Sequence, residues 1–238
     1  MAEAEMNEPQ LSRLGQVATD VVTRAARRNL AHQQEARTFR PAVAKSLTGM
    51  STTRLDRLIA TRRSVRSFSP RPVPRDLLAD VCRTAVEADE ALSFGAAPPR
   101  WVAVVQRVSG LDPALYTYTD GTFTRLADLP GADALRPSVQ PWFVSVPAQL
   151  TPLMNLTQSL RTEGTDGYFN ALVRTSYSLH SAWLSAVSAG VAGCLHRGLN
   201  PVLLQAVADL GRLDSRPFLA LALGYAESES DASGEPHG

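Results

Sequence analysis

Hydrophobic positions recur along this chain at the spacing of helices in some stretches and at the spacing of strands in others. Apolar side chains three and four residues apart predict amphipathic helices, because such residues share one helix face. Four stretches have this pattern: residues 9–30, 55–59, 77–85 and 168–189, the last of which is rich in small residues. Asn200 at a cap position, Pro201 in the first turn and Gly211 at the end predict a further helix.

Strand-like patterns are short and lie far apart in the sequence. They occur at residues 101–105, 115–118, 122–126, 142–146 and 218–223. Asp120-Gly121 separates the second from the third and predicts a tight hairpin turn, and Pro147 is expected to end the fourth. Helices interleaved with strands that are distant in sequence predict an α+β fold.

Shifts in composition divide the chain into three parts. Residues 1–53 are expected to form a helical extension and a linker, residues 54–225 the main domain, and residues 226–238 a disordered acidic tail. The extension carries a cluster of basic residues. This cluster is either a docking surface for an acidic partner or peptide, or a solvated helix face.

Composition and charge exclude several classes of function. The hydrophobic content of 44% and the charged content of 20% are those of an ordinary soluble globular protein. A net charge of +1 argues against a general nucleic-acid binder, and a single lysine, Lys45, removes most candidates for Schiff-base chemistry. The four histidines lack metal-ligand spacing, so no metal site is expected. Without an apolar signal segment or a run of membrane-spanning length, we expect a cytoplasmic protein that does not contact membranes.

Arginine residues gather in the run Arg62-Arg63-Ser64-Val65-Arg66, between two of the helical patterns. Guanidinium groups form planar, bidentate and permanently charged contacts with phosphate. A cluster of them in a short ordered turn is therefore a candidate phosphate clamp. The alternative is a solvated basic turn without a ligand.

This run, followed by residues 72–74 (Pro-Val-Pro) and a helix, resembles the opening signature of the FMN-dependent nitroreductase family. The resemblance implies that Arg62, Ser64 and Arg66 hold the phosphate and the ribityl chain of FMN, with Arg63 beside them. Each charge-assisted hydrogen bond would contribute roughly 1.5–3 kcal/mol. A few such bonds together retain a cofactor without a covalent link.

Further matches, in the right order over residues 54–225, resemble one branch of that family, the SagB-type dehydrogenases. These matches lie at residues 93–99, 108–118, 167–172 and 190–198. The first of them implies that Ser93, Gly95 and Ala96 line the flavin. Small residues suit that position because they let the backbone approach a flat ring.

The last of these segments is expected to face the reactive edge of the flavin. The resemblance places Gly193, His196, Arg197 and Gly198 there. His196 could donate a hydrogen bond to the ring or to the substrate. Arg197 either places a cation near the flavin or points to solvent. Cys194 is expected to pack behind the flavin rather than to act as a redox thiol.

Two departures from the branch bear on the chemistry. The azoline-oxidising members carry a Lys-Tyr pair before the long helix, thought to act as the base, and this chain has Thr162-Glu163 there. Glu163 could replace that base if partial burial raised its pKa; the alternative is an exposed loop carboxylate. The family also often supplies a basic residue after its last strand, where this chain has no basic residue between Gly224 and Glu229.

The resemblance implies the α+β nitroreductase fold, with a central mixed or antiparallel sheet flanked by helices. It also implies a homodimer with residues 168–189 at the interface and two FMN sites built from both chains. The leading function is an FMN-dependent oxidoreductase of SagB type. It would oxidise an azoline of a ribosomally synthesised peptide to the azole, and a cyclodehydratase is a candidate partner.

Two other functions remain open at this point. One is a generic NAD(P)H-dependent reductase of nitro compounds, quinones or enoyl groups on the same fold. The other is a dimeric scaffold subunit of a peptide-modifying complex that has lost catalysis. The replaced Lys-Tyr pair and the missing C-terminal cation favour the scaffold, and the arginine cluster favours an enzyme that binds FMN.

Overall fold

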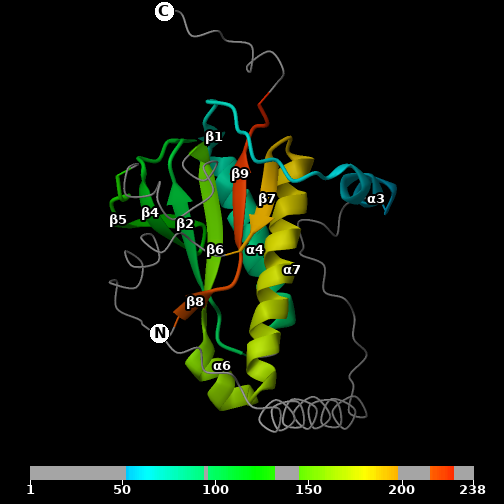
Figure 1. Ribbon diagram of the computed structural model, residues 1–238, viewed down its shortest axis with the longest axis vertical. Helices are drawn as coiled ribbons and strands as arrows, with labels where there is room; N and C mark the ends of the chain where they lie inside the picture. The colour runs from blue at the N-terminus through cyan, green and yellow to red at the C-terminus, as the bar shows by residue number, and fades with distance from the viewer. Residues whose placement is uncertain (1–51, 94–95, 132–144, 198–214, 228–238) are drawn as a thin grey trace, which may run out of the picture. The chain divides into compact units, whose positions relative to one another are not determined.

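The computed structural model of the chain describes four ranges of residues: 52–93, 96–131, 145–197 and 215–227. Figure 1 draws these ranges in colour. The helices expected over residues 9–30 and 201–211 lie outside them, as do most of the N-terminal extension and of the C-terminal tail. No helix within the described ranges is both long enough and apolar enough to span a membrane.

An antiparallel sheet lies at the centre of the described structure (Figure 1). Its strands are β2 (Arg100–Val105), β4 (Ala114–Thr119), β5 (Thr122–Ala127), β6 (Ala148–Asn155), β7 (Ala192–His196), β8 (Ser215–Pro217) and β9 (Ala220–Gly224). They follow the order β5-β4-β2-β6-β9-β7, and β8 pairs with the end of β6. Two short strands, β1 (Val73–Pro74) and β3 (Val108–Ser109), form a separate parallel pair.

Helices cover one face of this sheet. The described helices are α3 (Thr52–Thr61), α4 (Arg75–Leu92), α6 (Leu156–Glu163) and α7 (Asp166–Ser188). Cys82 of α4, Leu179 of α7 and Leu221 of β9 belong to one buried cluster, so α4 and α7 pack on the same sheet face. Val104 of β2 lies in a smaller cluster on the opposite face. The expected α+β fold, with an antiparallel sheet flanked by helices, is confirmed.

Elements with a strong local signal occur where the sequence predicts them. Both residues of the Asp120-Gly121 turn have positive φ angles, 48° and 79°, and they join β4 to β5. That backbone geometry is the one a two-residue hairpin requires. The helices expected from residues 77–85 and 168–189 are α4 and α7.

The strand expected over residues 142–146 is wrong in its described part. Residues 145 and 146 are not in a strand, and β6 begins only after Pro147. The carbonyl of Pro147 accepts hydrogen bonds from the N–H groups of Gln106 and Arg107, both at 2.9 Å. This proline therefore forms part of a turn that precedes the strand, instead of ending one.

Neither β6 nor α6 has a counterpart among the expected elements. Pro152 lies between the stretches of β6 that pair with β9 and with β8, so the proline falls at a break in that ladder. Asn155 then caps α6, and its side chain accepts a hydrogen bond from the N–H of Gln158. Glu163 is consequently the last residue of a helix and not a loop residue.

Candidate functional site

The run of residues 62–66, called the arginine–serine corner below, is fixed to the sheet by its backbone. The N–H of Val65 donates to the carbonyl of Gly193 in β7 at 3.0 Å, and Ser64 forms an isolated bridge with the same glycine. Further along, the N–H of Ser69 donates to the carbonyl of Tyr225 at 2.9 Å. The corner therefore sits beside β7, and the segment after it lies beside the end of β9.

Arg62 is held in place by an aromatic ring. Its guanidinium carbon lies 4.1 Å from the ring centroid of Trp183 on α7, which is a cation–π contact. Arg62 is partly buried and forms no ion pair with any other described residue. Its charge is therefore oriented by Trp183 but is not neutralised by any carboxylate of the described residues.

A glycine makes this stacking possible. A Cβ added to Gly193 would lie 2.8 Å from the carbonyl oxygen of Ala222 and 3.1 Å from the ring of Trp183. Neither contact is sterically acceptable without a shift, so only glycine lets the indole reach the strand here. The position of Trp183, and with it that of Arg62, depends on this residue.

The other members of the corner differ in their surroundings. Ser64 and Arg66 are exposed, and neither side chain bonds another described residue. Arg63 turns back to α3, where its guanidinium donates to the carbonyls of Ala60 and Arg62 at 2.9 and 3.0 Å. Arg63 thus satisfies carbonyl groups at the end of a helix, while Ser64 and Arg66 keep their polar groups toward solvent.

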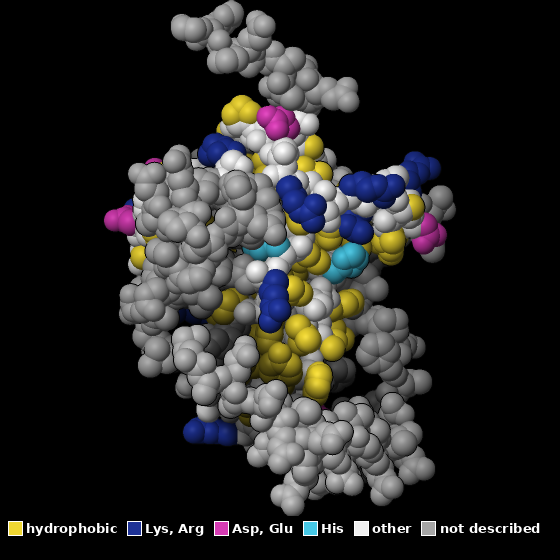
Figure 2. All heavy atoms as spheres, in the orientation of Figure 1, with side chains coloured by type: hydrophobic (Ala, Val, Ile, Leu, Met, Phe, Trp, Pro, Cys, Tyr) yellow, Lys and Arg dark blue, Asp and Glu magenta, His cyan; other side chains and the backbone are white. Residues whose placement is uncertain are grey.

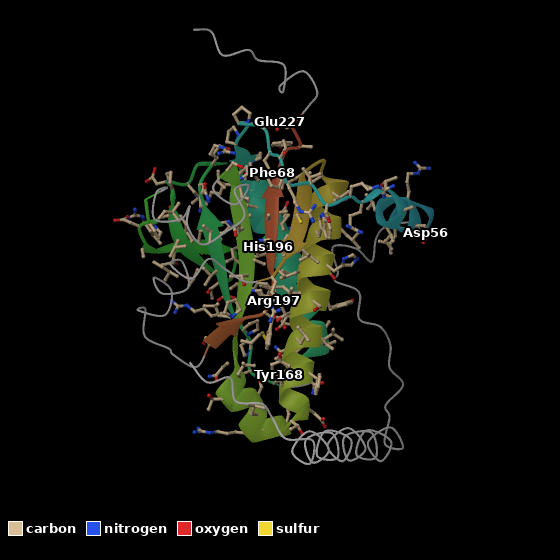
Figure 3. All side chains as sticks on the ribbon, in the orientation of Figure 1. Asp56, Phe68, Tyr168, His196, Arg197 and Glu227 are labelled. Atoms are coloured by element: carbon tan, nitrogen blue, oxygen red, sulfur yellow. The ribbon has the colours of Figure 1, made fainter. Side chains whose placement is uncertain are left out.

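Two histidines lie near these arginines. Figure 2 shows arginine side chains gathered around both described histidine side chains on one face of the molecule. His180 stacks edge-on against Trp183, and burial together with the charge of Arg62 lowers the pKa of His180. An imidazole with a lowered pKa is neutral at pH 7 and can both donate and accept a hydrogen bond. Figure 3 places His196, at the end of β7, with Arg197 after it.

Sequence reasoning missed His180 and Trp183 as site residues. Both lie in the long apolar pattern of α7, where neither stands out from the core. The available signal was their spacing of three residues on one helix face, which places both on the side facing β7.

A buried ion pair holds the loop after α4. Arg174 of α7 donates to both carboxylate oxygens of Asp89 in α4, at 3.0 and 2.7 Å, and both side chains are only 4% exposed. One of the same nitrogens also donates to the carbonyl of Ala97 at 3.2 Å. Burial raises the pKa of Asp89, and the bonds and charge of Arg174 oppose that rise. The pair anchors the segment after Ser93 and Ala96, two of the expected flavin contacts.

Not all of the expected site residues can be placed. Gly95 and Gly198 lie outside the described residues. Glu163 is partly buried and accepts a hydrogen bond from the side chain of Asn170 at 2.6 Å. Asn170 and Trp183 are thirteen residues apart on α7, which at the rise of a helix is roughly 20 Å. Within one chain, Glu163 is therefore far from the arginine–serine corner.

A cation from another segment, Arg71, lies at the end of β9. The guanidinium carbon of Arg71 lies 3.8 Å from the ring centroid of Tyr225, the residue after β9. The N–H of Glu227 donates to the carbonyl of Ser67 at 3.2 Å, so the two segments run side by side. The sequence provides no basic residue after β9, but the fold brings one there from another segment.

Cysteine and metal chemistry have little support in the described residues. Cys82 is fully buried, and burial raises the pKa of its thiol, so it is not a reactive thiolate. Cys194 is buried in a small cluster with Phe68 and Ala222, as expected for a packing residue. In the described part of the chain, no three His, Cys, Asp or Glu side chains are grouped as metal ligands would be.

Comparisons with known proteins agree with the observed fold. Residues 59–225 match the nitroreductase family, whereas no curated protein matches the chain. A nitroreductase structure from Ralstonia eutropha has a TM-score of 0.59 at 20% identity, covering 80% of this chain and 95% of that one. A second, from Anabaena variabilis, has a TM-score of 0.60 at 16% identity over 73% of this chain. This chain spans only 38% of the Anabaena protein's length.

Proposed function

The chain belongs to the nitroreductase family, and from that premise we propose that it is an FMN-dependent oxidoreductase of SagB type. It would oxidise an azoline in a ribosomally synthesised peptide to the azole. The observation that carries the proposal is the arginine–serine corner, where a stacked guanidinium that has no carboxylate partner in the described ranges lies beside β7. Such a group is suited to bind a phosphate.

The residues of the corner fit the cofactor. Arg62, Ser64 and Arg66 would hold the phosphate and ribityl chain of FMN, because their polar groups are not engaged by other described side chains. Gly193 lets the indole of Trp183 approach β7, and this indole orients Arg62. When bound, FMN supplies the two-electron acceptor of the reaction. His180 and His196 offer hydrogen-bonding groups nearby, His180 in its neutral form.

A second copy of the chain would complete the site. Phe169 and Val173 of α7 are 61% and 57% exposed, and they lie four residues apart on one helix face. Tyr168 beside them is also exposed, so the start of α7 presents an apolar surface. Burying it against the partner would form the homodimer. It would also let Glu163 of one chain approach the corner of the other, which the separation within one chain forbids.

Each alternative function keeps one supporting observation. Several structural neighbours are named nitroreductases, among them a protein from Bacteroides thetaiotaomicron whose name is NADH dehydrogenase/NAD(P)H nitroreductase, which favours a generic reductase. Glu163, the candidate base, is bonded to Asn170 near the start of α7 and so lies far from the corner within one chain, which favours a scaffold. The generic reductase requires bound flavin and a nicotinamide donor. The scaffold requires neither of them.

Visible spectra of the purified protein test the cofactor. We expect flavin bands at near-stoichiometric level, and the loss of most of them in the double variant Arg62→Ala/Arg66→Ala. The matched control is Arg83→Ala/Arg125→Ala, which removes two exposed arginines that pair locally with acids on α4 and after β5. If both double variants retain flavin equally, the clamp is refuted. A protein that stays colourless with excess FMN would support the scaffold.

Electron flow then separates oxidase from reductase. Under anaerobic conditions an azoline peptide should bleach the flavin, and NADPH should not. Rapid bleaching by NADPH alone would assign the generic reductase instead. Glu163→Gln should slow bleaching by the peptide without reducing flavin content, and full activity of this variant would exclude Glu163 as the base.

A further inference from the structure

A pocket of about 530 Å³ lies away from the arginine–serine corner, where β2 begins and β6 ends. It is lined by Ala97, Pro98, Pro99, Arg100, Leu153, Asn155, Gln158 and Ser215. The first four lead into β2 or begin it, and the other four belong to the lower end of β6 in Figure 1, to the adjoining β8 and to the start of α6. Its volume is in the range of small-molecule sites.

The lining of this pocket carries a positive charge and no negative charge. Arg100 is partly buried, and no Asp or Glu occurs among the lining residues. In the part of the chain that the structure describes, the guanidinium of Arg100 has no carboxylate partner. Arginine remains charged at all physiological pH values. The pocket therefore presents a cation that no described carboxylate neutralises.

The neighbouring polar groups are arranged as donors. The side-chain oxygen of Asn155 already accepts the N–H of Gln158 at 3.0 Å, which leaves its NH₂ group to donate. The side-chain amide of Gln158 is exposed at the rim. A guanidinium and two amide groups together match an acceptor-rich ligand group such as a carboxylate.

An apolar part of the lining adjoins Arg100, whose Cα partner on β6 is Leu153, and is firmly held. It consists of Leu153, which is 4% exposed, and of Pro98 and Pro99. Proline fixes its own φ angle, and the carbonyl of Ala97 is bound by buried Arg174 at 3.2 Å. A preorganised wall loses little entropy when a ligand binds. This side of the pocket suits a small hydrocarbon group rather than a second charge.

From these features we propose that the pocket binds a carboxylate that carries a short apolar side chain, with Arg100 as the principal contact. Two sources share this chemistry: the C-terminus of a peptide and a free aliphatic acid. The proposal does not depend on FMN, because none of the lining residues belongs to the arginine–serine corner. Ala97, Pro98 and Pro99 end the segment 93–99 that resembles the SagB-type branch, but no residue of the pocket lining is among those that the resemblance assigns to the flavin.

Titration calorimetry with the full-length protein tests the site. N-acetyl-leucine should bind, and N-acetyl-leucinamide, which has the same body without the charge, should bind roughly tenfold more weakly or worse. 4-Methylpentanoate, a free aliphatic acid without the peptide group, is titrated in the same way to distinguish the two sources. Binding equal to that of N-acetyl-leucine indicates a free acid, and much weaker binding indicates a peptide terminus.

Variants decide whether Arg100 is responsible. Arg100→Gln should weaken N-acetyl-leucine roughly tenfold or more, while Arg125→Gln, on exposed β5, should leave it unchanged. Flavin absorbance of the same samples is the independent readout, and Arg100→Gln should retain it. Equal binding of acid and amide, or unchanged binding by Arg100→Gln, overturns the proposal whether or not the protein proves to hold FMN.

Discussion

Replacing Arg174 by methionine would leave a buried carboxylate without its partner. The wild-type arginine makes two hydrogen bonds to Asp89, at 3.0 and 2.7 Å, and one to the carbonyl of Ala97 at 3.2 Å. Both charged side chains are 4% exposed, so water cannot replace the lost contacts. Removing one member of such a pair costs about 3–5 kcal/mol of unfolding free energy. That is a large share of the roughly 5–15 kcal/mol that stabilise a typical domain.

The double variant Asp89→Leu/Arg174→Met separates charge from packing. It removes both ions and fills similar volume with apolar groups, a change that is often neutral or stabilising. Only the hydrogen bond to Ala97 is then lost, at a cost of about 1 kcal/mol. We expect the double variant to be more stable than the single variant by about 2–4 kcal/mol.

The loss of unfolding free energy in the Arg174→Met variant should depend on pH. Burial raises the pKa of Asp89 even while Arg174 opposes the shift, so without the arginine that pKa rises further. A carboxyl whose folded-state pKa exceeds its unfolded value makes the folded protein bind the extra proton. The destabilisation is therefore complete above the raised pKa and shrinks as the pH falls through it toward the unfolded value.

Urea unfolding followed by far-UV circular dichroism measures both effects. Wild type, Arg174→Met and Asp89→Leu/Arg174→Met are compared at pH 7 and at pH 4.5. The stability gap between the single and double variants should be smaller at the lower pH. A single variant as stable as the double at pH 7, or an equal gap at both pH values, would refute the reasoning about the buried charge.

Other predictions concern the cofactor and the dimer. Arg62→Gln should raise the Kd for FMN by roughly tenfold to a hundredfold, measured by quenching of flavin fluorescence; Arg83→Gln should not change it. Gly193→Ala should lower the unfolding free energy by about 1–3 kcal/mol in urea titrations, because its Cβ would crowd a carbonyl and an indole. Val173→Asp should shift the protein to monomer in sedimentation experiments, whereas Thr124→Asp, on exposed β5, should leave the dimer intact.

Local signals explain which elements the sequence predicts. The Asp120-Gly121 turn and the apolar faces of α4 and α7 depend on neighbouring residues alone, and all of them occur in the structure. β6 is different, because it has one β-branched residue, Thr151, and a proline in its interior. Its place in the sheet comes from pairing with β2, which is distant in sequence. α6 did have a signal, since Asn155 precedes Gln158 by three residues as a cap does.

The candidate site shows the same difference between local signals, which the sequence reveals, and long-range contacts, which it does not. The arginine–serine corner is a contiguous run, so its residue types were visible in the sequence. The support of the corner was not, because Trp183 reaches Arg62 across more than a hundred residues of chain. The same holds for Asp89 and Arg174, which are 85 positions apart. Helical periodicity places each on a buried face but does not say which charge meets which.

The cation missing after β9 shows how a departure in sequence can leave the charge in place. Arg71 stacks over Tyr225, and the chain after Tyr225 runs beside the segment that follows the corner. A phosphate bound at the corner responds to where a guanidinium lies and not to which segment supplies it. The absence of a basic residue between Gly224 and Glu229 is therefore weak support for a scaffold that has lost FMN. The replaced Lys-Tyr pair is stronger support, because Glu163 lies far from the corner within one chain and no arginine of the corner can act as a base.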